Sequence, residues 1–190
     1  MQLRVHAFME SSTVNGPGAR AVVWVQGCPL RCPGCWNPQT HDPLRGFQRD
    51  VSEILEWFAR VSCENRIEGL TISGGEPMEQ ASAVLELLRR LKAAHPAMTT
   101  GLFSGYTERE LPDALWRAMQ GHLDFAVLGR YNARRRSHDP LVTSTNQVLH
   151  LYTTRYSMAD FEAQAAEVHI DDTGLAQITG FPVLGSPVLG

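Results

Sequence analysis

Three of the four cysteines stand close together in the sequence, as Cys28, Cys32 and Cys35 in a CxxxCxxC spacing. Thiolates this near to one another along a chain can surround a single soft-metal centre. Three thiolates satisfy three irons of a cubane 4Fe-4S cluster and leave the fourth iron open to another ligand. The spacing therefore predicts an iron–sulfur site with a free coordination position.

Two other interpretations of these cysteines stay open. A structural zinc ion needs four ligands, and His41 is the nearest candidate for the fourth. A set of surface redox cysteines is the second alternative, although the turns preset by Pro29 and Pro33 favour a tight loop. Cys63 is too far along the chain to join the others, and we expect a buried apolar thiol near the end of a helix.

A second motif, Ser73-Gly74-Gly75-Glu76-Pro77, follows an expected buried strand and precedes an expected helix. Backbone without side chains can approach a ligand closely. An acidic residue at such a place can accept hydrogen bonds from an ammonium group. Alone the motif is weak evidence, because a glycine pair at a strand-to-helix turn often serves backbone geometry only.

Together the two motifs resemble the radical S-adenosylmethionine (SAM) superfamily. The resemblance implies that the three clustered cysteines hold a 4Fe-4S cluster whose open iron is chelated by the amino and carboxylate groups of SAM. It also implies that Gly74, Gly75 and Glu76 contact the methionine amino group.

Further segments are similar to the activating proteins of anaerobic ribonucleotide reductase and their short relatives. This resemblance implies that a 5'-deoxyadenosyl radical removes a hydrogen from a glycine of a partner glycyl radical enzyme, with the electron coming from a flavodoxin or ferredoxin type donor. The alternatives are a stand-alone radical SAM enzyme acting on a small metabolite or peptide, a synthase of the 7-carboxy-7-deazaguanine type, and a metal-binding interaction module. The similar segments are GCPLRCPGCWNPQT (27–40), TISGGEP (71–77), SGYT (104–107), GRY (129–131), STNQ (144–147) and ITGFP (178–182).

Three further residues are candidates for SAM binding. Trp36 is the adenine candidate, with simple packing as the alternative. Ser104 could contact the ribose, or it could cap the next helix. Arg130 could pair with the SAM carboxylate or face solvent. His41 stands where an aromatic residue is usual and Leu128 where an acidic one is common, so the substrate stays open.

Arg134, Arg135 and Arg136 form a basic run after the GRY segment. Such a run is usually a solvated face. The alternative is a docking site for an acidic partner surface or an anionic substrate, since guanidinium groups favour phosphate and carboxylate. Asp171 and Asp172 belong to an expected hairpin turn that ends at Gly174, rather than to a metal site.

The elements that must position these motifs alternate between strands and helices, which indicates right-handed crossovers and a parallel sheet. A complete eightfold barrel needs about 250 residues. We therefore predict an α/β fold, an open partial βα barrel of the radical SAM type, in a single domain over residues 1–190. Loops at the carboxyl ends of its strands should face one shared cavity. We expect strands at 3–9, 21–26, 67–72, 99–103, 123–128 and 148–152, helices at 51–58, 84–91 and 108–119, and a C-terminal β-hairpin pairing 167–171 with 175–178.

Composition limits the remaining possibilities. The 190 residues are 43% hydrophobic and 19% charged, as in an ordinary folded domain. A net charge of -3 lacks the basic excess of nucleic-acid binding. The N-terminus has no basic stretch before an apolar run, and no apolar run is long enough to span a membrane. We therefore expect a cytoplasmic protein, where clustered cysteines bind metal more often than they form disulfides.

Overall fold

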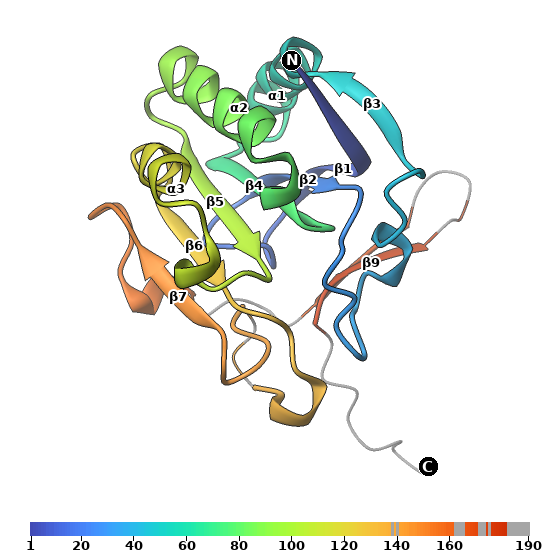
Figure 1. The fold of residues 1–190 in the computed structure, drawn as a ribbon. Helices are drawn as coiled ribbons and strands as arrows, with labels where there is room; N and C mark the ends of the chain where they lie inside the picture. The colour runs from blue at the N-terminus through green and yellow to red at the C-terminus, as the bar shows by residue number, and fades with distance from the viewer. Residues whose placement is uncertain (138, 140, 162–165, 171–173, 175, 182–190) are drawn as a thin grey trace.

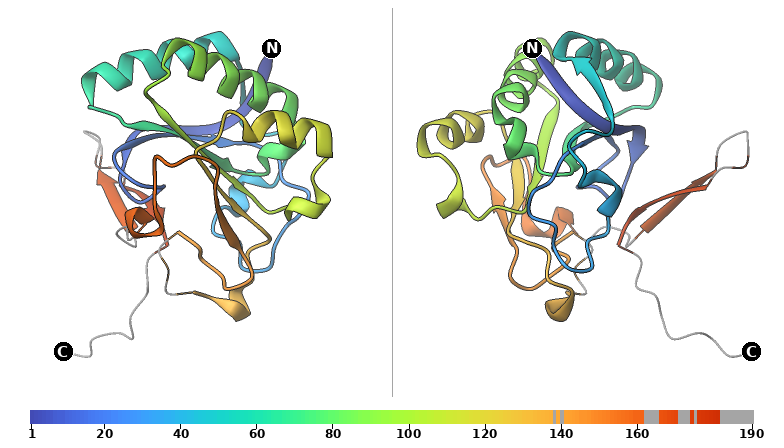
Figure 2. Two further views of the ribbon diagram at one scale, coloured as in Figure 1. Left: turned by 90° about the vertical axis from the view of Figure 1, so that its left-hand side faces the viewer. Right: turned by 45° about the vertical axis from the view of Figure 1, so that its right-hand side comes forward.

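The computed structural model describes residues 1–137, 139, 141–161, 166–170, 174 and 176–181. A seven-stranded sheet in the order β3-β1-β2-β4-β5-β6-β7 lies under three α-helices, which cover one of its faces (Figure 1). A separate two-stranded hairpin projects from the opposite side (Figure 2). The elements are β1 Gln2–Ser12, β2 Arg20–Val25, β3 Phe47–Asp50, α1 Val51–Glu64, β4 Gly69–Gly74, α2 Ala81–Ala94, β5 Thr99–Ser104, α3 Asp113–Gln120, β6 Phe125–Leu128, β7 Val148–Leu151, β8 Ala166–Ile170 and β9 Ala176–Gly180.

The four central strands β2, β4, β5 and β6 are parallel, whereas β1, β3 and β7 pair antiparallel to their neighbours. Helices α1, α2 and α3 form the crossovers between the parallel strands. The prediction of an α/β fold with a mostly parallel sheet and a C-terminal hairpin is confirmed. The sequence reading missed β3, a short strand at the sheet edge with no alternating apolar pattern.

Helix α1 begins at a capping box. The Asp50 side chain accepts a hydrogen bond from the Ser52 N–H, and Glu53 accepts one from the Asp50 N–H. The buried residues of the helix recur at helical spacing and include Phe58. The prediction that Cys63 is buried is wrong, because this residue falls off the apolar stripe and its side chain is exposed.

Helix α3 begins at Asp113 rather than at residue 108. Residues 108–110 form a separate 3-10 turn, after which Leu111 has an extended backbone with ψ 139°. Pro112 explains the break, because proline disfavours helical geometry in the residue before it. The expected helix is therefore divided into a turn and a shorter helix.

The inner face of the sheet, opposite the helices, is filled at its amino end by Arg20, which is fully buried. Its guanidinium group donates to the hydroxyls of Thr71 at 2.7 Å and Thr99 at 2.9 Å. It also donates to the Tyr156 hydroxyl at 3.2 Å and lies 5.1 Å from the centre of the Phe125 ring. Hydrogen bonds thus satisfy this buried cation, as burial of a charge requires.

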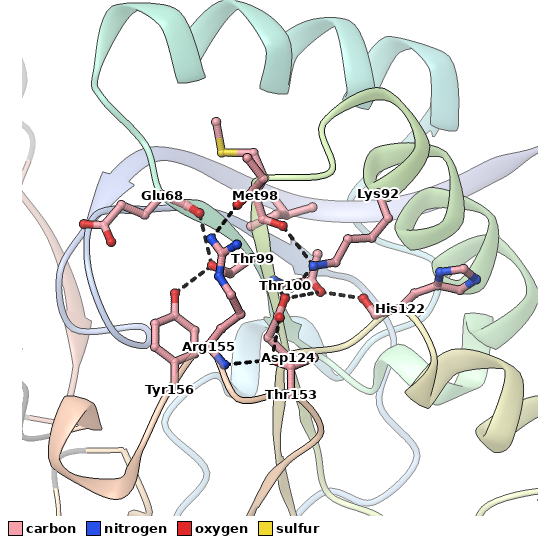
Figure 3. Close-up of polar contacts among 12 residues, drawn as sticks. Glu68, Lys92, Met98, Thr99, Thr100, His122, Asp124, Thr153, Arg155 and Tyr156 are labelled. Atoms are coloured by element: carbon pink, nitrogen blue, oxygen red, sulfur yellow. Dashed lines mark hydrogen bonds and ion pairs between the residues drawn. The ribbon is translucent and has the colours of Figure 1, made fainter.

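A second polar network at this end of the sheet joins α2, β5 and the segment after β7 (Figure 3). The buried carboxylate of Asp124 accepts hydrogen bonds from Lys92 Nζ at 2.6 Å, the Thr100 N–H at 2.8 Å and the Thr153 hydroxyl at 2.8 Å. These contacts fix the amino ends of β5 and β6, and the loops that carry the motifs leave the opposite, carboxyl ends of the strands. Throughout the described ranges, no helix combines the length and apolar character needed to cross a membrane.

Candidate functional site

A cavity of about 630 Å³ lies on the inner face at the carboxyl ends of the central strands. All four strands β2, β4, β5 and β6 contribute to its wall, among others through Trp24, Ser73, Phe103 and Val127. The predicted shared cavity is confirmed, because the loops after these strands meet around it. The last residues of the strands and the loops that follow them contribute Cys28, Cys32, Cys35, Trp36, Gly74, Gly75, Glu76, Ser104 and Gly129 to the lining.

The Cys loop, residues 27–43, is closed on itself by backbone hydrogen bonds. The Gly27 N–H donates to the Thr40 carbonyl at 2.8 Å, and the Cys28 N–H donates to the His41 carbonyl at 3.2 Å. Gly27 has φ +96°, a conformation that favours glycine. The loop therefore holds its three half-buried, unpaired thiols against one cavity.

Burial raises the pKa of the Cys28 and Cys35 thiols. Backbone N–H groups oppose this effect at both sulfurs; the Asn37 N–H, for example, lies 3.4 Å from Cys35 Sγ. Metal binding must therefore displace protons from these groups. Three thiols on one loop, open to a cavity on the same side, fit a cluster that binds three cysteines and keeps one iron free.

The zinc interpretation needs a compact set of four ligands. Among the described residues, no three His, Cys, Asp or Glu side chains are gathered closely enough to hold one metal ion. His41 contributes its carbonyl group to the Cys loop, and within the described part of the chain its buried Nε2 has no hydrogen-bond partner. This absence includes the three clustered thiols themselves, so it does not distinguish a zinc ion from a cluster.

The glycine loop, residues 73–77, is pressed against the start of the Cys loop. The Gly75 N–H donates to the Val25 carbonyl and the Glu76 N–H donates to the Gly27 carbonyl, both at 2.8 Å. A Cβ atom on Gly75 would overlap the Gly27 carbonyl oxygen, and Gly74 has φ +106°. Both glycines are thus needed for the close approach of the two loops.

Glu76 is fully buried beside the cavity. Its carboxylate accepts hydrogen bonds from the Met78 N–H at 2.9 Å, the Ser104 hydroxyl at 2.8 Å and the Gly105 N–H at 2.8 Å. Burial raises the pKa of Glu76 to about 7, and the three hydrogen bonds act against this rise. A carboxylate offers about four lone-pair sites, and these three hydrogen bonds occupy three of them.

Ser104 lies between Glu76 and the following loop. Its hydroxyl donates to Glu76 and accepts from the Tyr106 N–H at 3.1 Å. Ser104 thus positions the carboxylate and also lines the cavity. Its contact with a ribose stays a prediction.

Arg130 is the one predicted cofactor residue that does not line the cavity. Its guanidinium group forms an ion pair with Glu110 at 2.8 Å and lies 5.6 Å from the centre of the Tyr106 ring. The adjoining Gly129 does line the cavity. The ion pair with Glu110 thus holds a guanidinium that is not part of the cavity lining.

Trp36 contacts an aromatic ring and a guanidinium group that the sequence does not predict as its neighbours. Its ring meets Phe181 edge-on at 5.5 Å, and the Arg136 guanidinium lies 5.6 Å from its centre. The buried Trp36 Nε1 has no hydrogen-bond partner within the described ranges, so a donor is available beside the cavity. Phe181 belongs to the ITGFP segment, for which the sequence predicts no role at the site and whose Pro182 lies outside the described residues.

Gln147 is a second missed residue, from the STNQ segment. Its side-chain carbonyl accepts from the Thr143 hydroxyl at 2.9 Å and the Ser144 N–H at 3.0 Å, and its amide donates to the Gly129 carbonyl at 3.0 Å. Asn146 donates to the Arg130 carbonyl at 2.7 Å. The segment therefore clamps the loop after β6.

The C-terminal hairpin is attached to the end of β1 by polar contacts. Glu167 accepts hydrogen bonds from the Ser12 hydroxyl at 2.7 Å and the Thr13 N–H at 2.8 Å. Asn15 Nδ2 donates to the Thr179 hydroxyl at 2.9 Å. These contacts place the end of β9 at the cavity wall. The expected turn residues Asp171 and Asp172 lie outside the described residues.

Fold and site together define an α/β iron–sulfur protein with a cofactor cavity beside its thiols. Residues 14–150 match the family described as 4Fe-4S single cluster domain. The chain is 35% identical over 158 residues to the anaerobic ribonucleoside-triphosphate reductase-activating protein of Vibrio cholerae, covering 80% of this chain and 99% of that protein. It is 32% identical over 147 residues to the pyruvate formate-lyase-activating enzyme of Listeria monocytogenes, covering 75% of this chain and 59% of that enzyme.

The activating protein of phage T4 for the same reductase is 31% identical over 120 residues, covering 62% of this chain and 74% of that protein. The chain belongs to the 4Fe-4S single cluster domain family and, within the radical SAM enzymes, to the activating-protein group. The resemblance drawn from the motifs is thereby confirmed.

Proposed function

We propose that this chain activates a partner glycyl radical enzyme, such as an anaerobic ribonucleotide reductase, by removing a hydrogen atom from one of its glycines. One observation carries the proposal: the three thiols and the glycine loop line the same cavity. The near-complete coverage of the Vibrio cholerae activating protein supports the partner class. The partner would present its glycine to the cavity from outside.

When bound, a 4Fe-4S cluster and SAM supply one-electron cleavage to methionine and a 5'-deoxyadenosyl radical. Cys28, Cys32 and Cys35 would hold the cluster. Gly74 and Gly75 bring bare backbone to the place where an amino-acid group would lie, and the remaining acceptor position of Glu76 suits its ammonium. The available Nε1 donor of Trp36 suits an adenine.

The other predicted details belong to the same proposal. The fold would be an open partial βα barrel of the radical SAM type, in a single domain over residues 1–190. Arg130 would reach a SAM carboxylate only by exchanging Glu110 for it. Ser104 could contact the ribose while holding Glu76. A flavodoxin or ferredoxin type donor would supply the electron, in a reducing cytoplasm.

Anaerobic reconstitution tests this function. The loaded protein should contain about four irons and, with dithionite, should cleave SAM to 5'-deoxyadenosine and methionine. Mixed with the partner enzyme, it should produce an oxygen-sensitive glycyl radical signal in the EPR spectrum. Transfer of deuterium from a labelled small metabolite into 5'-deoxyadenosine, with no partner protein present, would replace the activating function with a metabolite-acting one.

A further inference from the structure

Three exposed arginines stand in the Cys loop or in the 3-10 helix that packs against it, and we call them the basic rim: Arg31, Arg134 and Arg135. Arg31 stands within the Cys loop, between Cys28 and Cys32. The other two belong to a short 3-10 helix, Ala133–Arg135. No rim residue lines the cavity, so their side chains belong to the surface around it.

The rim is held against the cluster-binding loop. A Cβ atom on Gly34, between the second and third cysteines, would lie only 3.1 Å from the Ala133 Cβ. The neighbouring Arg136 guanidinium lies over the Trp36 ring at 5.6 Å. These contacts place the positive charge of the 3-10 helix within side-chain reach of the metal-binding loop.

The charge of the rim is not neutralised by neighbours. Among the described residues, the ion pairs that the structure forms include none of the three rim arginines. Arg135 Nε donates to the Thr145 hydroxyl at 3.3 Å, which leaves its charge in place. Glu110 is already paired with Arg130. The whole chain has a net charge of -3, so the rim is a local group of positive charges on a protein whose net charge is negative.

The two macromolecules that the proposed function requires need different sides of the Cys loop. The hydrogen atom must be taken inside the cavity, where Ser73, Phe103 and Val127 form the wall. An electron that does not pass through the cavity would reach the three cysteines by way of the Cys loop, which carries Arg31 and packs against Ala133. We therefore expect a protein that delivers electrons to dock on the side of the Cys loop away from the cavity, and a protein that presents a glycine to dock on the cavity side.

We propose that the basic rim docks an acidic surface of the one-electron donor, a small reduced flavin or iron–sulfur protein. This proposal rests on the proposed function. In each encounter one electron passes from the donor, which is oxidised by one electron, to the cluster, which is reduced by one electron. No covalent bond forms or breaks in this step. Complementary charge steers such encounters and makes them sensitive to salt.

The test compares two charge-reversal variants of the reconstituted protein. In the first, Arg134→Glu and Arg135→Glu are combined. In the control, Arg66→Glu and Arg117→Glu make the same change in net charge at two arginines that are also exposed and also absent from the ion pairs of the described residues. The probe is an acidic flavodoxin in its oxidised form, whose binding is followed by the change in flavin fluorescence.

We expect the rim variant to bind flavodoxin at least about 10-fold more weakly at 0.05 M salt than the control variant. The difference should nearly disappear at about 1 M salt, where the Debye length is about 3 Å. SAM cleavage driven by reduced flavodoxin should fall in the rim variant, whereas cleavage driven by dithionite, which needs no docking, should be unchanged.

Equal flavodoxin binding by the two variants would overturn the docking proposal. It would also be overturned if only the transfer of the radical to the partner enzyme fell, because the rim would then dock that enzyme. Failure of dithionite to drive SAM cleavage in the unaltered protein would count against the proposed function instead. The binding measurement would still decide the docking surface on its own.

Discussion

The buried carboxylate of Glu76 should make the stability of the metal-free protein depend on pH. Its pKa is raised from 4.5 to about 7 in the folded state, because burial disfavours the charged form. The folded state therefore binds the proton more tightly than the unfolded state does. The free energy of unfolding must then fall as the pH rises from the unfolded pKa through the folded one.

The perturbation is Glu76→Gln, which removes the ionisation. At pH 5.5 ionisation costs the unaltered protein about 1.4 kcal/mol and at pH 8 about 3.4 kcal/mol, since one pKa unit is about 1.36 kcal/mol. A glutamine would also turn its amide toward one of the N–H donors that the carboxylate now accepts, at a cost of about 1 to 3 kcal/mol at either pH. The destabilisation by Glu76→Gln should thus be about 2 kcal/mol smaller at pH 8 than at pH 5.5.

Urea unfolding of both proteins at the two pH values, in the presence of a reductant, measures this difference. The control is Glu56→Gln on α1, which removes an exposed carboxylate that takes part in none of the ion pairs found among the described residues. A difference between Glu76→Gln and the unaltered protein that stays constant from pH 5.5 to pH 8 would refute the raised pKa.

Three further outcomes are expected. Gly75→Ala should weaken SAM binding at least about 10-fold and lower the free energy of unfolding by about 1 to 3 kcal/mol, because its Cβ would overlap the Gly27 carbonyl. The control is Gly121→Ala, whose Cβ meets nothing closer than 3.6 Å. Equal effects of the two substitutions would contradict the close approach of the two loops. Cys63→Ala should retain a full cluster by iron analysis, whereas alanine at any of the three clustered cysteines should abolish it. Ser104→Ala should retain the cluster but weaken SAM binding several-fold, as seen by calorimetry, since Glu76 loses a hydrogen bond of about 1.5 kcal/mol.

The motifs and the positions of the central strands along the chain could be predicted because both depend on local sequence. A CxxxCxxC spacing and a glycine pair after a buried strand carry their chemistry within a few residues. Alternating strands and helices then require the parallel sheet, and a parallel sheet brings its loops to one edge. The shared cavity follows from these local facts alone.

The remaining features depend on contacts between distant segments. The sequence around Arg130 does not predict Glu110 as its ion-pair partner, and the sequence around Glu76 does not predict its hydrogen bond with the Ser104 hydroxyl. The exposure of Cys63 depends on which side of α1 meets the sheet. Phe181 reaches the site only because the hairpin is attached to β1.

The buried Arg20, with Phe125 and Tyr156 around it, fills the inner face of the sheet at the end away from the loops. Because the amino end of the inner face is filled, cofactors and a partner protein would have to use the same open side of the cavity. A large partner seated on the open side of the cavity would leave no entrance at the amino end, so SAM would have to bind before the partner and the products would leave after it. Preincubation with the partner should therefore slow the first turnover on adding SAM, and the lifetime of the complex would set a lower limit on the turnover time.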